Sequence, residues 1–168
     1  MAVKQWNVGD VLSAADMNAW TVPLAAVKPS DTGRTNSTTA FTNDPDLQFN
    51  AASGASYWIH GTTEYKGSVN TNSDIKFQIN APSGATGFVN ITYITLSGLN
   101  GSTDNLQVNT THTAGTNTTA NIEPLTFSGV ITTGGTAGII AFQWAQQTTN
   151  ATPTTVLTGS AMIAQRIN

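Results

Sequence analysis

The feature that most constrains the fold is a repeated alternation of apolar and polar residues in short stretches. In residues 75–80 an isoleucine or phenylalanine occupies every second position and polar residues fill the others. In the same way Tyr57 and Ile59 alternate with Trp58 and His60. A period of two is the signature of a half-buried strand, whereas a helix would repeat its apolar residues every three or four positions. The pattern therefore predicts strands.

Turn-forming residues separate these stretches, as in Pro82-Ser83-Gly84-Ala85 and in Asn100-Gly101. Charged residues are only 9% of the chain, compared with about 25% in an ordinary soluble domain. Thr, Asn, Ser and Gly take their place, and these residues favour strands and the turns between them. About eight to ten short strands with turn signals between them predict an all-β, antiparallel, jelly-roll-like sandwich.

Composition also excludes several classes of protein. A net charge of −3 with only six Lys and Arg argues against a nucleic-acid partner, which requires a basic surface. The chain has no cysteine, so it forms neither disulfides nor a thiolate nucleophile. It contains no apolar run near the roughly 18 residues of a membrane span and no apolar signal-peptide segment. We expect folding in the cytoplasm and no membrane partner.

The N-terminal residues differ from the rest. We expect a docking arm over residues 1–30 and one sandwich domain over residues 31–168. Ser13 has the position of a helix N-cap, which predicts one short helix over about residues 14–19. A helix this short persists only when packed. The packing residues are Trp6, Leu12, Met17 and Trp20, which we expect either to dock on another protein or to cover the sandwich's own core.

Two expected strands, 88–96 and 139–144, are apolar on both faces. The outer face of an antiparallel sandwich is usually exposed to water, so a second apolar face indicates a covering partner. We expect a homotrimer.

No catalytic constellation is evident. His60 and His112 are the only imidazoles, and we expect structural roles for both. Asp44 and Asp46 offer oxygen ligands but lack the glycine and terminal glutamate of a calcium loop. The sequence therefore predicts no enzyme, no metal site and no cofactor. Four aromatic residues lie within strand patterns, which favours packing in the core or at an interface over stacking of carbohydrate; these residues are Trp58, Tyr65, Tyr93 and Trp144.

The arm also carries a family resemblance. Residues 6–20 read Trp-x-x-Gly-Asp-Val-Leu-Ser-Ala-Ala-Asp-Met-Asn-Ala-Trp. This segment resembles the start of small tail-fibre, head-fibre and decoration proteins of tailed bacteriophages. Residues 31–47 resemble the entry to the first strand in such proteins from phages of actinobacteria, and Gly-Ser-Ala-Met-Ile-Ala-Gln-Arg-Ile over residues 159–167 is similar to their final strand.

The resemblance implies a structural protein on the surface of the virion. We expect a trimeric capsid decoration protein that binds the major capsid protein or another virion protein and stabilises the shell. A tail fibre needs a shaft of heptads or long repeats, and this sequence contains neither. The alternative is a minor tail, fibre or receptor-binding protein, whose sandwich would present aromatic residues to a host-surface glycan.

Overall fold

A computed structural model describes residues 7–11, 13–14, 23–36, 40–67, 75–94, 101–115 and 122–168. Every element in these residues is a β-strand. The twelve strands are β1 (Leu24–Val27), β2 (Thr32–Arg34), β3 (Thr42–Ala51), β4 (Ser56–Lys66), β5 (Ile75–Asn80), β6 (Thr86–Ile94), β7 (Gly101–Gln107), β8 (His112–Ala114), β9 (Glu123–Thr132), β10 (Gly138–Gln146), β11 (Thr154–Val156) and β12 (Ala161–Arg166).

The expected all-β class is confirmed, and the strands form two antiparallel sheets. The expected helix gains no support, because residues 15–19 lie outside the described residues. None of the described segments forms a helix of the length and apolarity that crossing a bilayer requires.

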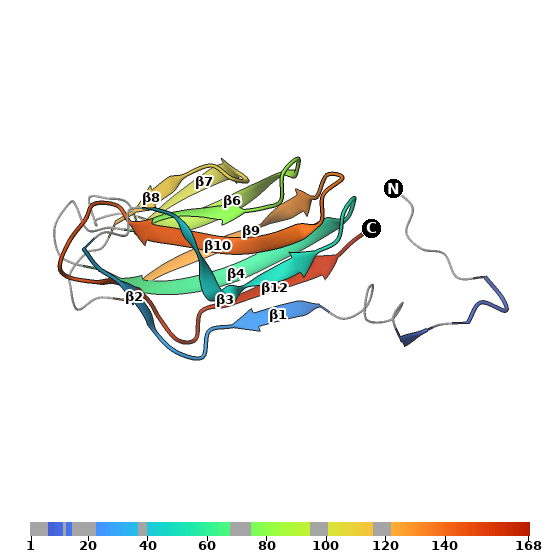
Figure 1. Cartoon of the computed structure of the whole chain (residues 1–168), viewed down its shortest axis with the longest axis horizontal. Helices are drawn as coiled ribbons and strands as arrows, with labels where there is room; N and C mark the ends of the chain where they lie inside the picture. The colour runs from blue at the N-terminus through green and yellow to red at the C-terminus, as the bar shows by residue number, and fades with distance from the viewer. Residues whose placement is uncertain are drawn as a thin grey trace.

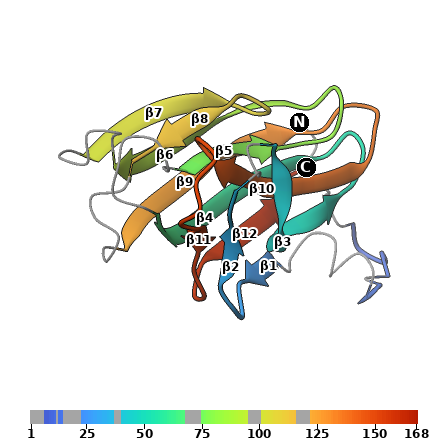
Figure 2. The same cartoon turned by 60° about the vertical axis from the view of Figure 1, so that its left-hand side comes forward.

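The larger sheet has the strand order β1-β12-β4-β9-β6-β7, with β11 paired to β2 and β4. The smaller sheet has the order β3-β10-β5-β8. Figure 1 shows β1 at one edge of the sandwich beside β12, and in Figure 2 β2 and β11 lie side by side. The eight strands from β3 to β10 pair in a nested way: β3 with β10, β4 with β9, β5 with β8 and β6 with β7.

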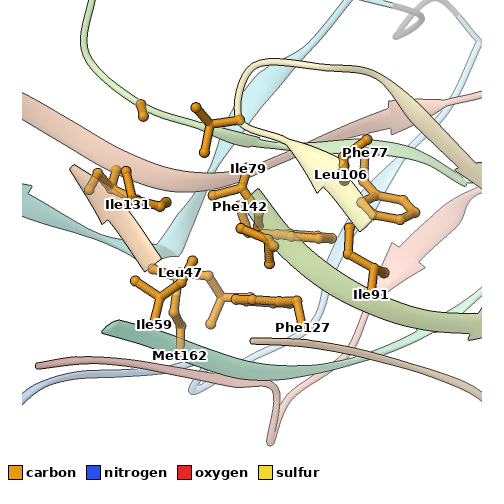
Figure 3. Close-up of a cluster of buried hydrophobic side chains, with 14 of the residues drawn as sticks. Leu47, Ile59, Phe77, Ile79, Ile91, Leu106, Phe127, Ile131, Phe142 and Met162 are labelled. Carbon is orange, nitrogen blue, oxygen red and sulfur yellow. The ribbon is translucent and has the colours of Figure 1, made fainter. Parts of the chain in front are cut away.

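The core lies between the two sheets. Phe127 of β9 stacks on Phe142 of β10 with ring centroids 6.1 Å apart, and Figure 3 shows these rings between the sheets. Phe77 of β5 extends the stack, 5.8 Å from Phe142. In β4 and β5 the buried and more exposed positions alternate as the sequence predicted. The core therefore follows directly from the period-two pattern.

One close approach between strands depends on a glycine. Gly129 of β9 lies opposite Val89 of β6. A Cβ atom at this position would lie 2.2 Å from the carbonyl oxygen of Phe88 and 2.8 Å from the Cα of Val89. Both atoms are backbone, so neither can move aside as a side-chain tip could. Glycine is thus required for β6 and β9 to pair at this distance.

The two strands expected to be apolar on both faces differ from each other. In β6 the outward Phe88 is 58% exposed, but Asn90 and Thr92 on the same face are polar. In β10 the outward Ile139 is 40% exposed, whereas Ala141 and Ala145 are fully buried within the single chain. Only the β6 side of the molecule therefore presents an aromatic ring to solvent at these strands.

Candidate docking surfaces

The four predicted docking residues, Trp6, Leu12, Met17 and Trp20, lie outside the described residues. Between them, residues 7–10 form a turn. The Asp10 backbone N–H donates to the Asn7 carbonyl oxygen at 3.1 Å, the Asn7 N–H donates to Asp10 Oδ2 at 2.8 Å, and Gly9 takes a φ of 101°. Val8 within this turn and Val11 directly after it are 109% and 87% exposed. The described part of the arm therefore presents apolar side chains to solvent.

The arm joins the sandwich through β1. This strand pairs with β12 from Leu24 to Val27, and the next residue, Lys28, is 1% exposed. The Lys28 backbone N–H donates to the Ser160 carbonyl oxygen at 2.8 Å, and its carbonyl oxygen accepts from the Gly159 N–H at 3.1 Å. Both the strand and the residue that follows it are thus held by the C-terminal part of the chain.

The Lys28 ammonium is buried among acidic and hydroxyl oxygens. It donates to Thr32 Oγ1 at 2.7 Å, to the two Asp44 oxygens at 3.0 and 3.1 Å, and to Asp46 Oδ2 at 3.0 Å. The Asp44 side chain is fully buried, whereas the Asp46 side chain is 27% exposed. A buried charge is tolerated when it is paired and hydrogen-bonded, and Lys28 satisfies both conditions.

Asp44 has further partners besides Lys28. The Trp144 indole Nε1–H donates to Oδ2 at 3.1 Å, and the backbone N–H groups of Asp46 and Leu47 donate to Oδ1 at 3.1 and 3.2 Å. These donors belong to β3 and β10. The Asp44 carboxylate therefore links the smaller sheet by hydrogen bonds to Lys28, the residue directly after β1. Pro45 interrupts β3 without loss of a ladder bond, because β3 is at the edge of its sheet.

Arg34 of β2 completes the group. Its guanidinium carbon lies 3.9 Å from the centre of the Trp144 ring, and its nitrogens donate to the Trp144 and Asn43 carbonyl oxygens. Burial lowers the pKa of Arg34 below its usual value, an effect that the nearby Asp44 carboxylate opposes. We refer to Lys28, Arg34, Asp44, Asp46 and Trp144 as the arm-root cluster. It contains two cations and two carboxylates, so its formal charge is zero.

Sequence reasoning missed this cluster. The sequence pattern marked Asp44 and Asp46 only as oxygen ligands for calcium, but in the structure both carboxylates contact the Lys28 ammonium. Within the described residues there is no group of three or more His, Cys, Asp or Glu placed to bind a metal ion. One signal was available: residues 28–46 hold five of the fifteen charged residues of a charge-poor chain.

The outer side of the larger sheet has a different character. Three rows of outward-facing residues cross β12, β4, β9, β6 and β7, each residue paired in register with the next. The first row is Gln165, Trp58, Val130, Phe88 and Gln107. The second row is Ile163, His60, Ser128, Asn90 and Asn105, and the third is Ala161, Thr62, Thr126, Thr92 and Thr103. We name these three rows the uncharged face, because they contain no Asp, Glu, Lys or Arg.

The first row of the uncharged face is apolar at its centre. Trp58, Val130 and Phe88 are adjacent in the first row and are 44%, 42% and 58% exposed. The Trp58 ring stacks on His60 at a centroid distance of 6.1 Å and an interplanar angle of 13°. Three neighbouring strands thus hold exposed apolar side chains side by side. A contiguous group of this kind differs from the single, scattered apolar residues that are normal on a protein surface.

The outer side of the smaller sheet is covered by amide side chains. Gln78 Nε2 donates to Gln143 Oε1 at 2.6 Å, and Gln143 Nε2 donates to Asn43 Oδ1 at 2.6 Å. Asn43 Nδ2 then donates to Gln48 Oε1 at 3.2 Å. This ladder runs across β5, β10 and β3 and satisfies its own polar groups. Beside it, Phe49 and Ile139 border a hollow of about 170 Å³, which is smaller than a typical ligand pocket.

The two histidines lie on different sheets and do not form a catalytic pair. His60 lies on the uncharged face, whereas His112 of β8 lies at the edge between the sheets. His112 packs edge-on against Tyr93 at 4.4 Å, and its Nδ1 is 3.7 Å from Asp104 Oδ2. Its Nε2 is buried and has no hydrogen-bond partner among the residues that the structure describes. Burial lowers the pKa of His112 below the usual value for histidine, and Asp104 opposes this shift.

This lowered pKa predicts a loss of stability in acid. Between the folded-state pKa and the unfolded value of about 6.5, the unfolded chain binds a proton that the folded chain does not. The free energy of unfolding should therefore decrease as the pH falls below about 6.5. We expect urea titrations of His112→Asn to show a weaker pH dependence than those of the wild type. Asp104→Asn should strengthen the dependence, and equal pH profiles for all three proteins would contradict this assignment.

Comparisons with known proteins add little to this description. No family model matches the sequence, and no curated protein matches it. Among solved structures, the chain has weak structural similarity to proteins of infectious bursal disease virus particles. A structure of the Gt strain shares 12% identity at a TM-score of 0.22, covering 87% of this chain and 42% of the viral chain. A viral particle structure shares 10% at 0.24, covering 87% and 40%, and a VP2 subviral particle shares 14% at 0.21, covering 85% and 39%.

This chain therefore spans about two fifths of the length of the viral chains it matches. The TM-scores are far below those of chains that share a fold. Inferences about function consequently depend on the residues and geometry of this chain.

Proposed function

We propose that this chain is a non-enzymatic structural protein of a tailed-bacteriophage virion. In this proposal it is a capsid decoration protein that docks through its N-terminal arm, forms a homotrimer and stabilises the shell. The observation that carries the proposal is the arm. Its segment with two tryptophans resembles that of phage virion proteins, and its described residues leave Val8 and Val11 in solvent.

The sandwich supports an outward-docking arm because none of the arm residues that the structure describes belongs to the buried hydrophobic core. Among the described residues the buried core begins at Leu47 and contains residues of both sheets. Lys28 is the first buried residue of the described chain, and it belongs to the arm-root cluster. We therefore propose that residues 1–22 are the docking segment and that β1 is its attachment to the sandwich.

The strand topology also supports a virion role. Pairing of the first strand with the eighth, the second with the seventh and so on is the arrangement of a hairpin rolled into a jelly roll. The strands β3 to β10 follow it. We propose that the sandwich is a jelly roll, a fold used in viral capsids and also in lectins and cupins. Because a fold is compatible with several functions, the arm remains the stronger argument.

The test uses particles that lack the protein and purified full-length chain. Replacing both Trp6 and Trp20 with alanine should weaken binding to these particles on the order of a thousandfold, since each buried interface tryptophan contributes about 2 kcal/mol. Ile122→Ala is the control, because Ile122 is 55% exposed on the sandwich. Unchanged binding by the tryptophan variant, measured by co-sedimentation, would contradict docking through the arm.

The same particles locate the protein. Electron microscopy of bound protein should show it on the capsid surface, where bound trimers favour the assembled lattice by mass action and raise the melting temperature of the shell. Density on the tail instead would support the alternative, a minor tail, fibre or receptor-binding protein. The exposed Trp58 and Phe88 are the observation that favours this alternative.

A further inference from the structure

We infer that the uncharged face is the surface through which copies of this chain contact one another. The inference depends on the proposed function only for the number of copies, which that proposal sets at three. The face carries Trp58, Val130 and Phe88 in one exposed row, and the residues in the other two rows are mostly polar but neutral. This composition is that of an interface core, in which charged residues are depleted and aromatic residues are enriched.

The absence of charge is what points to a second copy as the occupant. Two charged faces of the same chain would repel each other or require a matching pattern of opposite charges. Here the same face of each copy can turn toward a common symmetry axis without burying a single Asp, Glu, Lys or Arg, so no ionised group has to be desolvated. The chain carries a net charge of −3, and those charges lie outside the three rows.

The size of the face is sufficient for association. Five strands about 4.8 Å apart and three rows about 6.8 Å apart give a surface of roughly 24 by 20 Å, or about 500 Å² per copy. Three copies that turn this face toward a common axis bury about 1,500 Å² in total, which is within the range of specific protein interfaces. β1 extends the same side of the sheet beyond β12 and adds to this area, with Val27 62% exposed.

The smaller sheet lacks these properties. Its outer side is occupied by the amide ladder from Gln78 to Gln48, whose polar groups already have partners within the chain. Its exposed apolar residue, Ile139, is paired in register with Asn50 and not with an exposed aromatic residue. Val130 and Ile139 are 42% and 40% exposed, so they form a matched pair for testing the two faces.

The first test introduces a charge on each face of the full chain. Light scattering of the wild type should give three times the 17.5 kDa of one chain. Val130→Lys should dissociate it to monomers, and Ile139→Lys should leave it unchanged. Wild-type behaviour of both variants would overturn the inference, because the copies would then associate through another surface. A monomeric wild type would also overturn it.

The second test avoids a large substitution. The chain has no cysteine, so Val130→Cys and Ile139→Cys each carry a single thiol. A maleimide should label Val130→Cys at least tenfold more slowly than Ile139→Cys in the assembled protein and at the same rate in urea. Equal rates in the assembled protein would overturn the inference.

The results of these tests distinguish a failure of this inference from a failure of the proposed function. A dimer that Val130→Lys dissociates and Ile139→Lys does not would support the uncharged face as the interface while contradicting the trimer. Particle binding that is lost in the arm variants but retained by Val130→Lys monomers, at reduced avidity, would support docking independently of the interface. A monomeric wild type whose uncharged face binds neutral oligosaccharides would assign the face to a glycan instead.

Discussion

Replacing Asp44 with asparagine should lower the free energy of unfolding by about 3–5 kcal/mol, because the variant leaves the Lys28 ammonium buried without its main counter-charge. Asp44 is fully buried and accepts hydrogen bonds from Lys28, from Trp144 and from two backbone N–H groups. Urea unfolding followed by circular dichroism measures the change. An effect below about 1 kcal/mol, the level of an exposed pair, would show that the cluster is screened by solvent.

Two further variants separate charge from packing. Asp46→Asn should destabilise the protein much less, since the Asp46 side chain is 27% exposed and water replaces the lost interaction. The double variant Lys28→Met with Asp44→Asn removes both charges. It should recover much of the loss, because an apolar or neutral pair no longer leaves an uncompensated ion.

Replacing Gly129 with alanine should cost about 3 kcal/mol or more, since the new methyl group meets backbone atoms of β6 that cannot rotate away. The obstructing atoms are the Phe88 carbonyl oxygen at 2.2 Å and the Val89 Cα at 2.8 Å. Separation of β6 from β9 would disturb the centre of the larger sheet. Thermal unfolding monitored by calorimetry measures the loss.

Gly135 provides the control for this substitution. A Cβ atom at Gly135 meets nothing within 4 Å, and this glycine lies in the loop before β10. Gly135→Ala should therefore leave stability unchanged or raise it slightly, because alanine restricts the unfolded chain. Equal stabilities for the two variants would contradict the close approach of β6 and β9.

The sequence predicted the strands and their buried faces because period-two alternation is a local property. The alternation in residues 57–65 and 75–80 matches the burial of β4 and β5 position by position. Period-two alternation does not indicate which strands lie next to each other in a sheet. Trp58, Val130 and Phe88 form one row only because the strand order of the larger sheet places β9 between β4 and β6, and this is a long-range property that alternation does not encode.

The arm-root cluster was beyond sequence reasoning for a related reason. Lys28 and Asp44 are 16 positions apart, and the Trp144 indole that shares Asp44 is 100 positions away. A tryptophan in an apolar stretch reads as a core residue, and its single N–H group gives no hint of its partner. Expected outward residues of β10 also looked apolar, yet Ala141 and Ala145 are small enough to be covered by neighbouring side chains.

The attachment of β1 has a mechanical consequence. If the proposed arm is pulled, the force reaches the sandwich at Leu24, the first residue of β1. A force along β1 acts in shear on its four register pairs with β12, so these pairs bear the load together. Peeling would instead break such pairs one after another. Behind the strand, the Lys28 side chain is anchored in the interior by Asp44 and Asp46. If the arm docks as proposed, a pull along it would load the β1–β12 pairs and the buried ion pairs of Lys28 before it could separate the two sheets.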